Sequence, residues 1–134
     1  MRADIKLENK GLLHLFNVHL GTAYRERRFQ ARKLLETVQP EEEKLKGKRI
    51  LIGDFNEWVR GLTTKLLSAH LKSADVKLHL QRSKTYPGIM PLLHLDHIYY
   101  DDQLEMESLY LHRSRRALVA SDHLPLVADF KMPE

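Results

Sequence analysis

Four short segments of the chain carry the side chains best suited to chemistry, namely histidines, aspartates and an asparagine. They are residues 17–20 (NVHL), 53–56 (GDFN), 95–98 (LDHI) and 121–125 (SDHLP). Each segment lies where an apolar run begins or ends, and open sheets concentrate their functional sites at strand ends. Carboxylates and imidazoles can transfer protons or bind ions, and an amide can donate to a phosphate oxygen. Together the four segments predict a polar site at one edge of a sheet.

Asp54 and Asn56 lie two residues apart directly after the apolar run 49–53. In an extended chain this spacing puts both side chains on one side, so the carboxylate can take a proton from water while the amide holds a phosphate oxygen. The alternative is a turn in which Asp and Asn make local hydrogen bonds, and for this segment alone the turn is the favoured interpretation.

Asp122 and His123 are adjacent, so in an extended chain their side chains point to opposite sides and can serve different partners. The carboxylate suits a hard cation such as Mg²⁺, and the imidazole suits a phosphate. Asp96 begins an apolar run, where a buried carboxylate needs a partner. If that partner is His123, Asp96 orients the ring and favours its charged form. The alternatives are a polar turn at Asp122 and an ion pair between Asp96 and a basic side chain.

The elements that must position these residues follow from the spacing of apolar side chains. The pattern predicts a hairpin over 5–20, helices over 22–39 and 62–71, a buried strand over 49–53, and a segment 77–95 that is mostly loop with one short strand. Further strands are predicted over 96–100, 106–111 and 124–130. The sum is a mixed α/β (α+β) chain of about six strands and two helices. His19 is then at the end of the second hairpin strand.

Composition limits the class of protein. The chain has 134 residues, 43% apolar and 30% charged, with no repeat or linker, which predicts one domain over residues 1–134. No apolar run approaches the roughly 18 residues that span a bilayer, the first residues do not resemble a secretory signal, and there is no cysteine. We therefore expect a cytoplasmic protein without a membrane span.

The net charge of +4 comes partly from basic clusters at residues 25–28, 44–49 and 113–116. These clusters suit an anionic substrate, although solvated surface is the alternative for each one. Nucleic-acid binding is possible but not favoured, because the basic residues are not interleaved with aromatic ones.

In this order, the four segments resemble the motifs of the endonuclease/exonuclease/phosphatase (DNase I-like) superfamily of divalent-metal phosphoesterases. The resemblance runs from Ile5 to Phe130, and the closing stretch 121–130 reads SDHLPLVADF. Residues 85–87 (TYP), ahead of 95–100 (LDHIYY), also resemble an uncharacterised bacterial subgroup of this superfamily.

The resemblance implies hydrolysis of a phosphodiester or phosphomonoester by metal-assisted attack of water, with Mg²⁺ or Mn²⁺ as cofactor. It implies that His19 contacts the scissile phosphate, that Asp54 orients or deprotonates the water and helps bind the metal, and that Asn56 stabilises the transition state. It further implies that Asp122 binds the metal, that Asp96 steers His123 onto the phosphate, and that Asn17 and Tyr86 contact a phosphorylated substrate.

One departure from the family pattern concerns the start of the chain. Family members carry an asparagine and a metal-binding glutamate upstream of the histidine strand, and no residue in 1–11 can be assigned to those motifs. The resemblance therefore implies the C-terminal half of a four-layer sandwich, with one mixed, mostly antiparallel sheet and two helices on its outer face. The other face, around Ile50, Ile52 and Val127, is then expected to lie open.

An open apolar face needs a cover, because each large side chain left exposed forfeits about 1.5 to 3 kcal/mol. A homodimer is the simplest cover, and the alternatives are a separate N-terminal half or the rest of a longer chain from which this sequence is taken. Two functions stay open: a working phosphoesterase, and a noncatalytic remnant that serves as a dimerisation or binding module.

Overall fold

The computed structural model describes residues 1–38, 47–57, 61–74 and 94–132. It has mixed α and β structure, which confirms the predicted fold class. The strands are β1 (Arg2–Leu7), β2 (Gly11–His19), β3 (Lys48–Asp54), β4 (Lys72–Ser73), β5 (Asp96–Tyr100), β6 (Glu105–Leu111) and β7 (Leu126–Lys131). The helices are α1 (Tyr24–Val38), α2 (Leu62–Ser68) and α4 (Arg115–Ala120).

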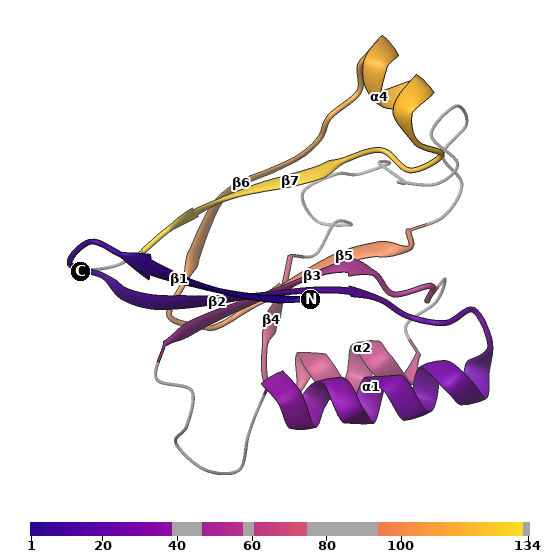
Figure 1. Ribbon diagram of the computed structural model, residues 1–134, viewed down its shortest axis with the longest axis horizontal. Helices are drawn as coiled ribbons and strands as arrows, with labels where there is room; N and C mark the ends of the chain where they lie inside the picture. The colour runs from indigo at the N-terminus through magenta and orange to yellow at the C-terminus, as the bar shows by residue number, and fades with distance from the viewer. Residues whose placement is uncertain (39–46, 58–60, 75–93, 133–134) are drawn as a thin grey trace.

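Five strands form a mixed sheet in the order β1-β2-β3-β5-β4, in which only β2 and β3 run parallel. The final two strands do not extend this sheet, as a single sheet of about six strands would require. They form a separate antiparallel pair instead. The reason is that β5 already has β3 on one side and β4 on the other, so β6 finds no free edge beside it and the chain turns into a second layer (Figure 1).

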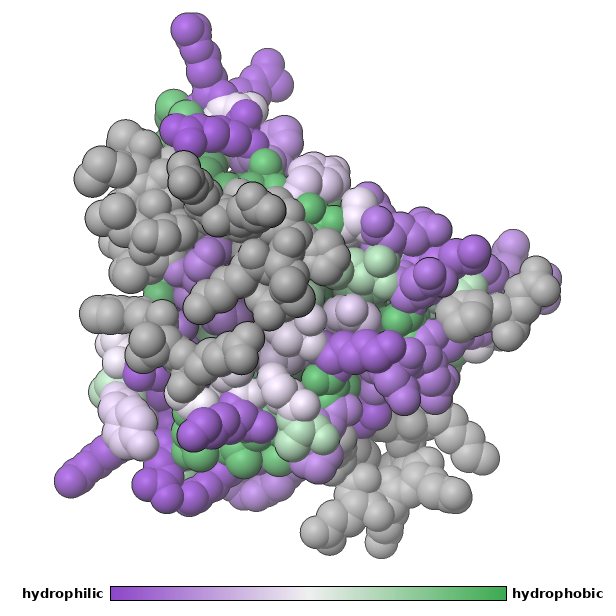
Figure 2. All heavy atoms as spheres, turned by 180° about the vertical axis from the view of Figure 1, so that it is seen from behind, coloured by the Kyte–Doolittle hydropathy of each residue, from purple (hydrophilic) through white to green (hydrophobic). Residues whose placement is uncertain are grey.

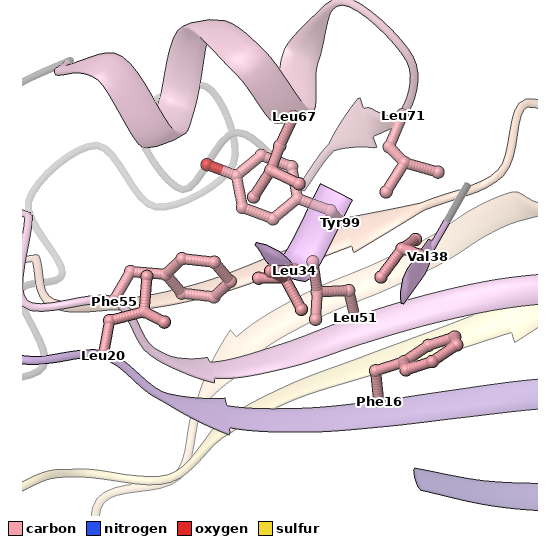
Figure 3. Close-up of a cluster of buried hydrophobic side chains, with 9 residues drawn as sticks. All are labelled: Phe16, Leu20, Leu34, Val38, Leu51, Phe55, Leu67, Leu71 and Tyr99. Carbon is pink, nitrogen blue, oxygen red and sulfur yellow. The ribbon is translucent and has the colours of Figure 1, made fainter. Parts of the chain in front are cut away.

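Helices α1 and α2 cover one face of the five-stranded sheet (Figure 1). Side chains alternate along β2, so that Phe16 faces the helices. Leu34 and Val38, on the apolar face of α1, pack in the same buried cluster. The resulting buried cluster, drawn in Figure 3, consists of Phe16, Leu20, Leu34, Val38, Leu51, Phe55, Leu67, Leu71 and Tyr99. This cluster is the main core and fixes the strands whose ends carry the candidate site.

The opposite face of the sheet is less open than the sequence predicts. The β6–β7 pair packs over it, and Ile50, expected to be exposed, retains only 8% of its accessible surface. Ile52 is half-buried, whereas Val127 does not belong to this face, because it lies on the covering strand β7. The expectation of a fully open face was therefore wrong, because the chain supplies two covering strands of its own. In the view from behind, apolar side chains are interspersed with hydrophilic ones (Figure 2).

Two elements were not predicted from the sequence. Strand β4 has only two residues, too few to show a periodic pattern. Helix α4 begins within the basic cluster 113–116, and the hydroxyl of Ser114 caps it by accepting a hydrogen bond from the Ala117 N–H. Most of the segment 77–95, predicted to be loop, lies outside the described residues. Among the residues described, no helix combines the length and apolar character needed to cross a membrane.

Candidate active site

The candidate site begins with a row of three side chains across neighbouring strands. In the strand register His19 on β2 lies opposite Asp54 on β3, and Asp54 lies opposite Asp96 on β5. Residues directly opposite one another in a sheet project to the same face. The row therefore lines up an imidazole and two carboxylates at one end of the sheet, on the face turned toward β6 and β7.

His123 joins this row from the segment that precedes β7. Its Nδ1 lies 2.8 Å from Asp96 Oδ2, and its Nε2 lies 3.9 Å from Asp54 Oδ2. On the other side, His19 Nε2 lies 3.6 Å from the same Asp54 oxygen. The Asp54 Oδ2 atom thus lies near an imidazole nitrogen of both His19 and His123, at distances beyond a direct hydrogen bond to either one.

Exposure separates the two histidines. The His19 side chain retains 77% of its accessible surface and that of His123 retains 25%, whereas Asp54 retains 15%. Burial by itself lowers the pKa of His123. The hydrogen bond to Asp96 and the negative charges of Asp96, Asp54 and Asp122 outweigh burial, so the pKa is raised above the usual histidine value. The surroundings of His123 therefore favour its charged form.

The turn after β3 uses the two oxygens of Asp54 differently. Oδ1 accepts a hydrogen bond of 2.8 Å from the Asn56 backbone N–H, whereas Oδ2 faces the histidines. Asn56 has a positive φ of 48°, and its buried side-chain amide donates to the Leu20 carbonyl at 2.7 Å. The turn interpretation of this segment is confirmed, and the extended arrangement expected for the functional one is not found, although the second Asp54 oxygen lies on the side of the histidines.

Gly53 is required where β3 approaches β2. Its φ is 139°, and a Cβ at this position would lie 1.9 Å from the Val18 carbonyl oxygen. A larger residue would push the two strands apart just before the row that contains His19 and Asp54.

The remaining predicted residues lie at the edge of the site or outside the described residues. Asp122 is exposed and acts on His123 through its charge. Asn17 is exposed on β2, two residues before His19 and on the same face of the strand. Tyr86 lies outside the described residues.

The donor atoms suit a hard cation only in part. Carboxylates such as Asp54 and Asp122 are the ligands that Mg²⁺ prefers, and this ion accepts one or two of them while keeping several waters. Within the described ranges, no group of three or more His, Asp or Glu side chains is arranged to hold a metal ion. A cation bound here would therefore rely strongly on water and substrate oxygens.

A cavity of about 320 Å³ opens beside the Asp96–His123 pair. Its walls include the apolar side chains of Ile52, Ile98 and Leu126. The site is thus bordered on one side by the gap between the five-stranded sheet and β7.

Two residues near the site were missed by sequence reasoning. Glu57 is 7% exposed, and its carboxylate accepts hydrogen bonds from α2. His97, beside Asp96, has its pKa lowered by burial, which outweighs the nearby negative charge of Glu57. The position of Glu57 directly after Asn56 was the available signal, but its partners lie six and seven residues further along the chain and cannot be read from spacing.

Comparison with known proteins assigns the family. A model of the endonuclease/exonuclease/phosphatase family matches residues 3–123, and the chain belongs to this family. It is 33% identical over 123 residues to the uncharacterized protein YbhP of Escherichia coli strain K12. That match covers 90% of this chain and 47% of YbhP, so the chain spans about half the length of this relative.

Solved structures confirm the fold. A mannosyl-6-phosphatase from Bacteroides thetaiotaomicron superposes with a TM-score of 0.71 at 18% identity, covering 95% of this chain and 54% of its own. The catalytic domain of human Nocturnin superposes with a TM-score of 0.71 at 24% identity, and the match covers 98% of this chain and 52% of the Nocturnin chain. D. rerio TDP2, complexed with a single-strand DNA product, superposes with a TM-score of 0.70 at 18% identity. That match covers 98% of this chain and 60% of the TDP2 chain. The chain therefore has the fold of roughly half of each of these proteins.

Proposed function

We propose that the chain contributes the hydrolytic site of a phosphoesterase that cleaves a phosphodiester or phosphomonoester with Mg²⁺ or Mn²⁺ as cofactor. The observation that carries this proposal is the Asp54 carboxylate, whose Oδ2 lies 3.6 Å from His19 Nε2 and 3.9 Å from His123 Nε2 without a direct hydrogen bond to either. Membership of the family supports the reaction type. A phosphorylated substrate also suits the net positive charge of the chain.

In this proposal Asp54 Oδ2 accepts the proton of the attacking water. His123, held charged and oriented by Asp96, donates through Nε2 to a nonbridging phosphate oxygen, where negative charge increases during attack. His19, at the exposed rim, contacts the phosphate from the other side. Asn56 has one amide hydrogen on Leu20, and we assign the remaining one to the same phosphate. Asn17 and Tyr86 stay assigned to substrate contact.

The metal ion would be held by Asp54 and Asp122. When bound, it would supply positive charge that neutralises the phosphate and favours attack by water. Carboxylate oxygens are the correct chemistry for this role, and the small number of them predicts weak binding by this chain alone.

Turnover of a chromogenic phosphodiester and a chromogenic phosphomonoester, each with Mg²⁺ and with Mn²⁺, tests the proposal. We expect hydrolysis that EDTA abolishes and that Asp54→Ala reduces to the background rate. Asp129→Ala is the matched control, because it removes an exposed carboxylate on β7 whose partner is Ser108. Absence of turnover with either metal at any concentration would instead favour the noncatalytic module.

The alternative function, a dimerisation or binding module, has an observation in its favour. Strands β6 and β7 pair only with each other among the described residues, and apolar side chains facing the gap, such as Leu15, Ile52 and Phe130, are only partly buried. We propose that a second copy of the chain covers this gap, with a separate polypeptide equivalent to the rest of the relatives as the other possible cover.

Light scattering coupled to size exclusion measures this directly. We expect the mass of a dimer, because burial of partly exposed apolar side chains stabilises association. A monomer at micromolar concentration would exclude the second copy as the cover.

A further inference from the structure

Glu57 follows the site turn and is buried although it carries a carboxylate. We propose that Glu57 is a positioning residue for the site, which fixes the turn 54–56 between α2 and β5 and thereby sets the place of the Asp54 carboxylate. This inference rests on the proposed function for its catalytic consequence. The geometric part of the inference does not depend on catalysis.

The carboxylate of Glu57 ties the turn to helix α2. It accepts hydrogen bonds from the backbone N–H groups of Thr63 at 3.2 Å and Thr64 at 2.8 Å, and from the Thr64 hydroxyl at 2.6 Å. Helix α2 has Gly61 at its N-cap, with no side-chain cap of its own. Glu57 therefore satisfies the N–H groups that a capping residue would otherwise bind.

The fit between this carboxylate and the start of α2 is tight. A Cβ added to Gly61 would lie 2.3 Å from Glu57 Oε1. The absence of a side chain at position 61 is therefore what lets the carboxylate reach the first turn of the helix.

The turn is also tied to strand β5. The Phe55 ring packs edge-on against the His97 ring with centroids 5.5 Å apart, and the Phe55 N–H donates a hydrogen bond of 2.8 Å to the Leu95 carbonyl just before β5. His97 is the neighbour of Asp96 in the chain, and Asp96 lies opposite Asp54 in the sheet. Both flanks of the turn are thus connected to elements that also hold the site.

A fixed turn matters because Asp54 has little to hold it on the side of the histidines. Its Oδ2 lies 3.6 Å from His19 Nε2 and 3.9 Å from His123 Nε2, so neither contact locks the carboxylate in place. The firm contact is the one to the Asn56 N–H, within the turn that Glu57 anchors. A displacement of the turn therefore moves Asp54 relative to both histidines.

A purely stabilising role for Glu57 is the competing explanation, and two variants distinguish it. Glu57→Ala removes the anchor. Leu67→Ala removes a fully buried side chain of α2 from the core cluster and leaves every Glu57 contact in place. Both lower the denaturation midpoint, but only Glu57→Ala is expected to move the turn.

The measurement combines kinetics on the full chain with NMR at a single pH. The probes are the side-chain amide signals of Asn56, which report its bond to Leu20, and the ring signals of His19 and His123. With a chromogenic phosphodiester and Mg²⁺, we expect Glu57→Ala to lower kcat by about 10- to 100-fold with KM little changed, and to shift these signals. Leu67→Ala should leave kcat and the signals as in the wild type.

Glu57→Gln keeps the side-chain length and one acceptor oxygen, so it should restore part of kcat and move the signals back toward their wild-type positions. If Glu57→Ala does not fold, Glu57→Gln decides the matter by the same signals. The inference is overturned if the signals do not move, or if Leu67→Ala moves them equally. A chain that hydrolyses no phosphoester yet shows the shifts would refute the proposed function and leave the positioning role standing.

Discussion

Strand β3 contributes to an acid–base pair at each of its ends, with Arg49 near its start and Asp54 at its end, and the two pairs differ in how closely their atoms approach. At the start of the strand, Arg49 and Asp101 are joined by side-chain hydrogen bonds of 2.7 to 3.1 Å, and the Arg49 N–H adds another of 2.6 Å. At its end, Asp54 Oδ2 is 3.6 Å or more from the nearest histidine nitrogen. The Arg49–Asp101 pair is fully hydrogen-bonded and holds structural elements together. The Asp54–histidine pairs lack direct hydrogen bonds, so they suit contact with a ligand.

The largest expected effect tests this contrast through stability. Asp101→Ala should lower the free energy of unfolding by about 3 to 5 kcal/mol, because the partly buried Arg49 guanidinium loses its partner. Asp54→Asn should change it by less than about 1 kcal/mol, because the amide oxygen can still accept the turn hydrogen bond from Asn56. Urea unfolding followed by circular dichroism measures both. Equal losses would remove the distinction between the two ends.

A smaller effect concerns the pH dependence of the pair between Asp96 and His123. The pKa of His123 is raised in the folded chain, so the pair stabilises the fold fully below the unfolded histidine pKa and this contribution is lost as pH rises through the folded one. Asp96→Asn should therefore lower the His123 pKa. It should also reduce stability at about pH 5 to 6 and have little effect above about pH 8.

An NMR titration of His123 and urea unfolding at the two pH values provide the measurements. The comparison of the two ends of β3 becomes sharper if Asp101→Ala shows the same loss at both pH values, since no histidine takes part in that pair. If the difference in free energy of unfolding between the wild type and Asp96→Asn did not change with pH, the assignment of the charge to His123 would be contradicted.

The smallest expected effect on stability concerns an exposed ion pair that neither anchors strands nor binds a ligand. It serves as the reference for the two pairs of β3. Lys33 and Glu36 on α1 are in contact at 2.8 Å, with side chains 61% and 64% exposed. Lys33→Ala should change the free energy of unfolding by less than about 0.5 kcal/mol, and less again in high salt. A loss comparable to that of Asp101→Ala would mean that burial is not what separates these pairs.

Sequence patterns predicted the parts of the fold that depend on local periodicity. The hairpin, helix α1 and the buried run at β3 follow from apolar spacing, and the placement of His19 and Asp54 at strand ends follows from them. The family resemblance supplied the pairing of Asp96 with His123, which the structure confirms at 2.8 Å. Spacing along the chain had left that pairing open against an ordinary ion pair.

Other features depend on contacts between distant residues. Alternation along β6 and β7 indicates strands but not their neighbours, so their departure into a second sheet was not predictable. The contacts of Glu57 were not predictable for a similar reason, because its partners Thr63 and Thr64 lie six and seven residues further along the chain. Local patterns identify which residues can react, and tertiary contacts decide how firmly each is held.

The hydrogen bond between Asp96 and His123 connects two layers, because Asp96 begins β5 in the larger sheet and His123 precedes β7 in the smaller one. The spacing between these layers is set by side chains far from the reacting atoms, such as Tyr100 and Phe130, whose rings meet at 4.9 Å. A change in the thickness of this packing alters the orientation of the imidazole without touching the site. The geometry of the Asp96–His123 pair is therefore open to tuning by substitutions at the opposite end of the interlayer core.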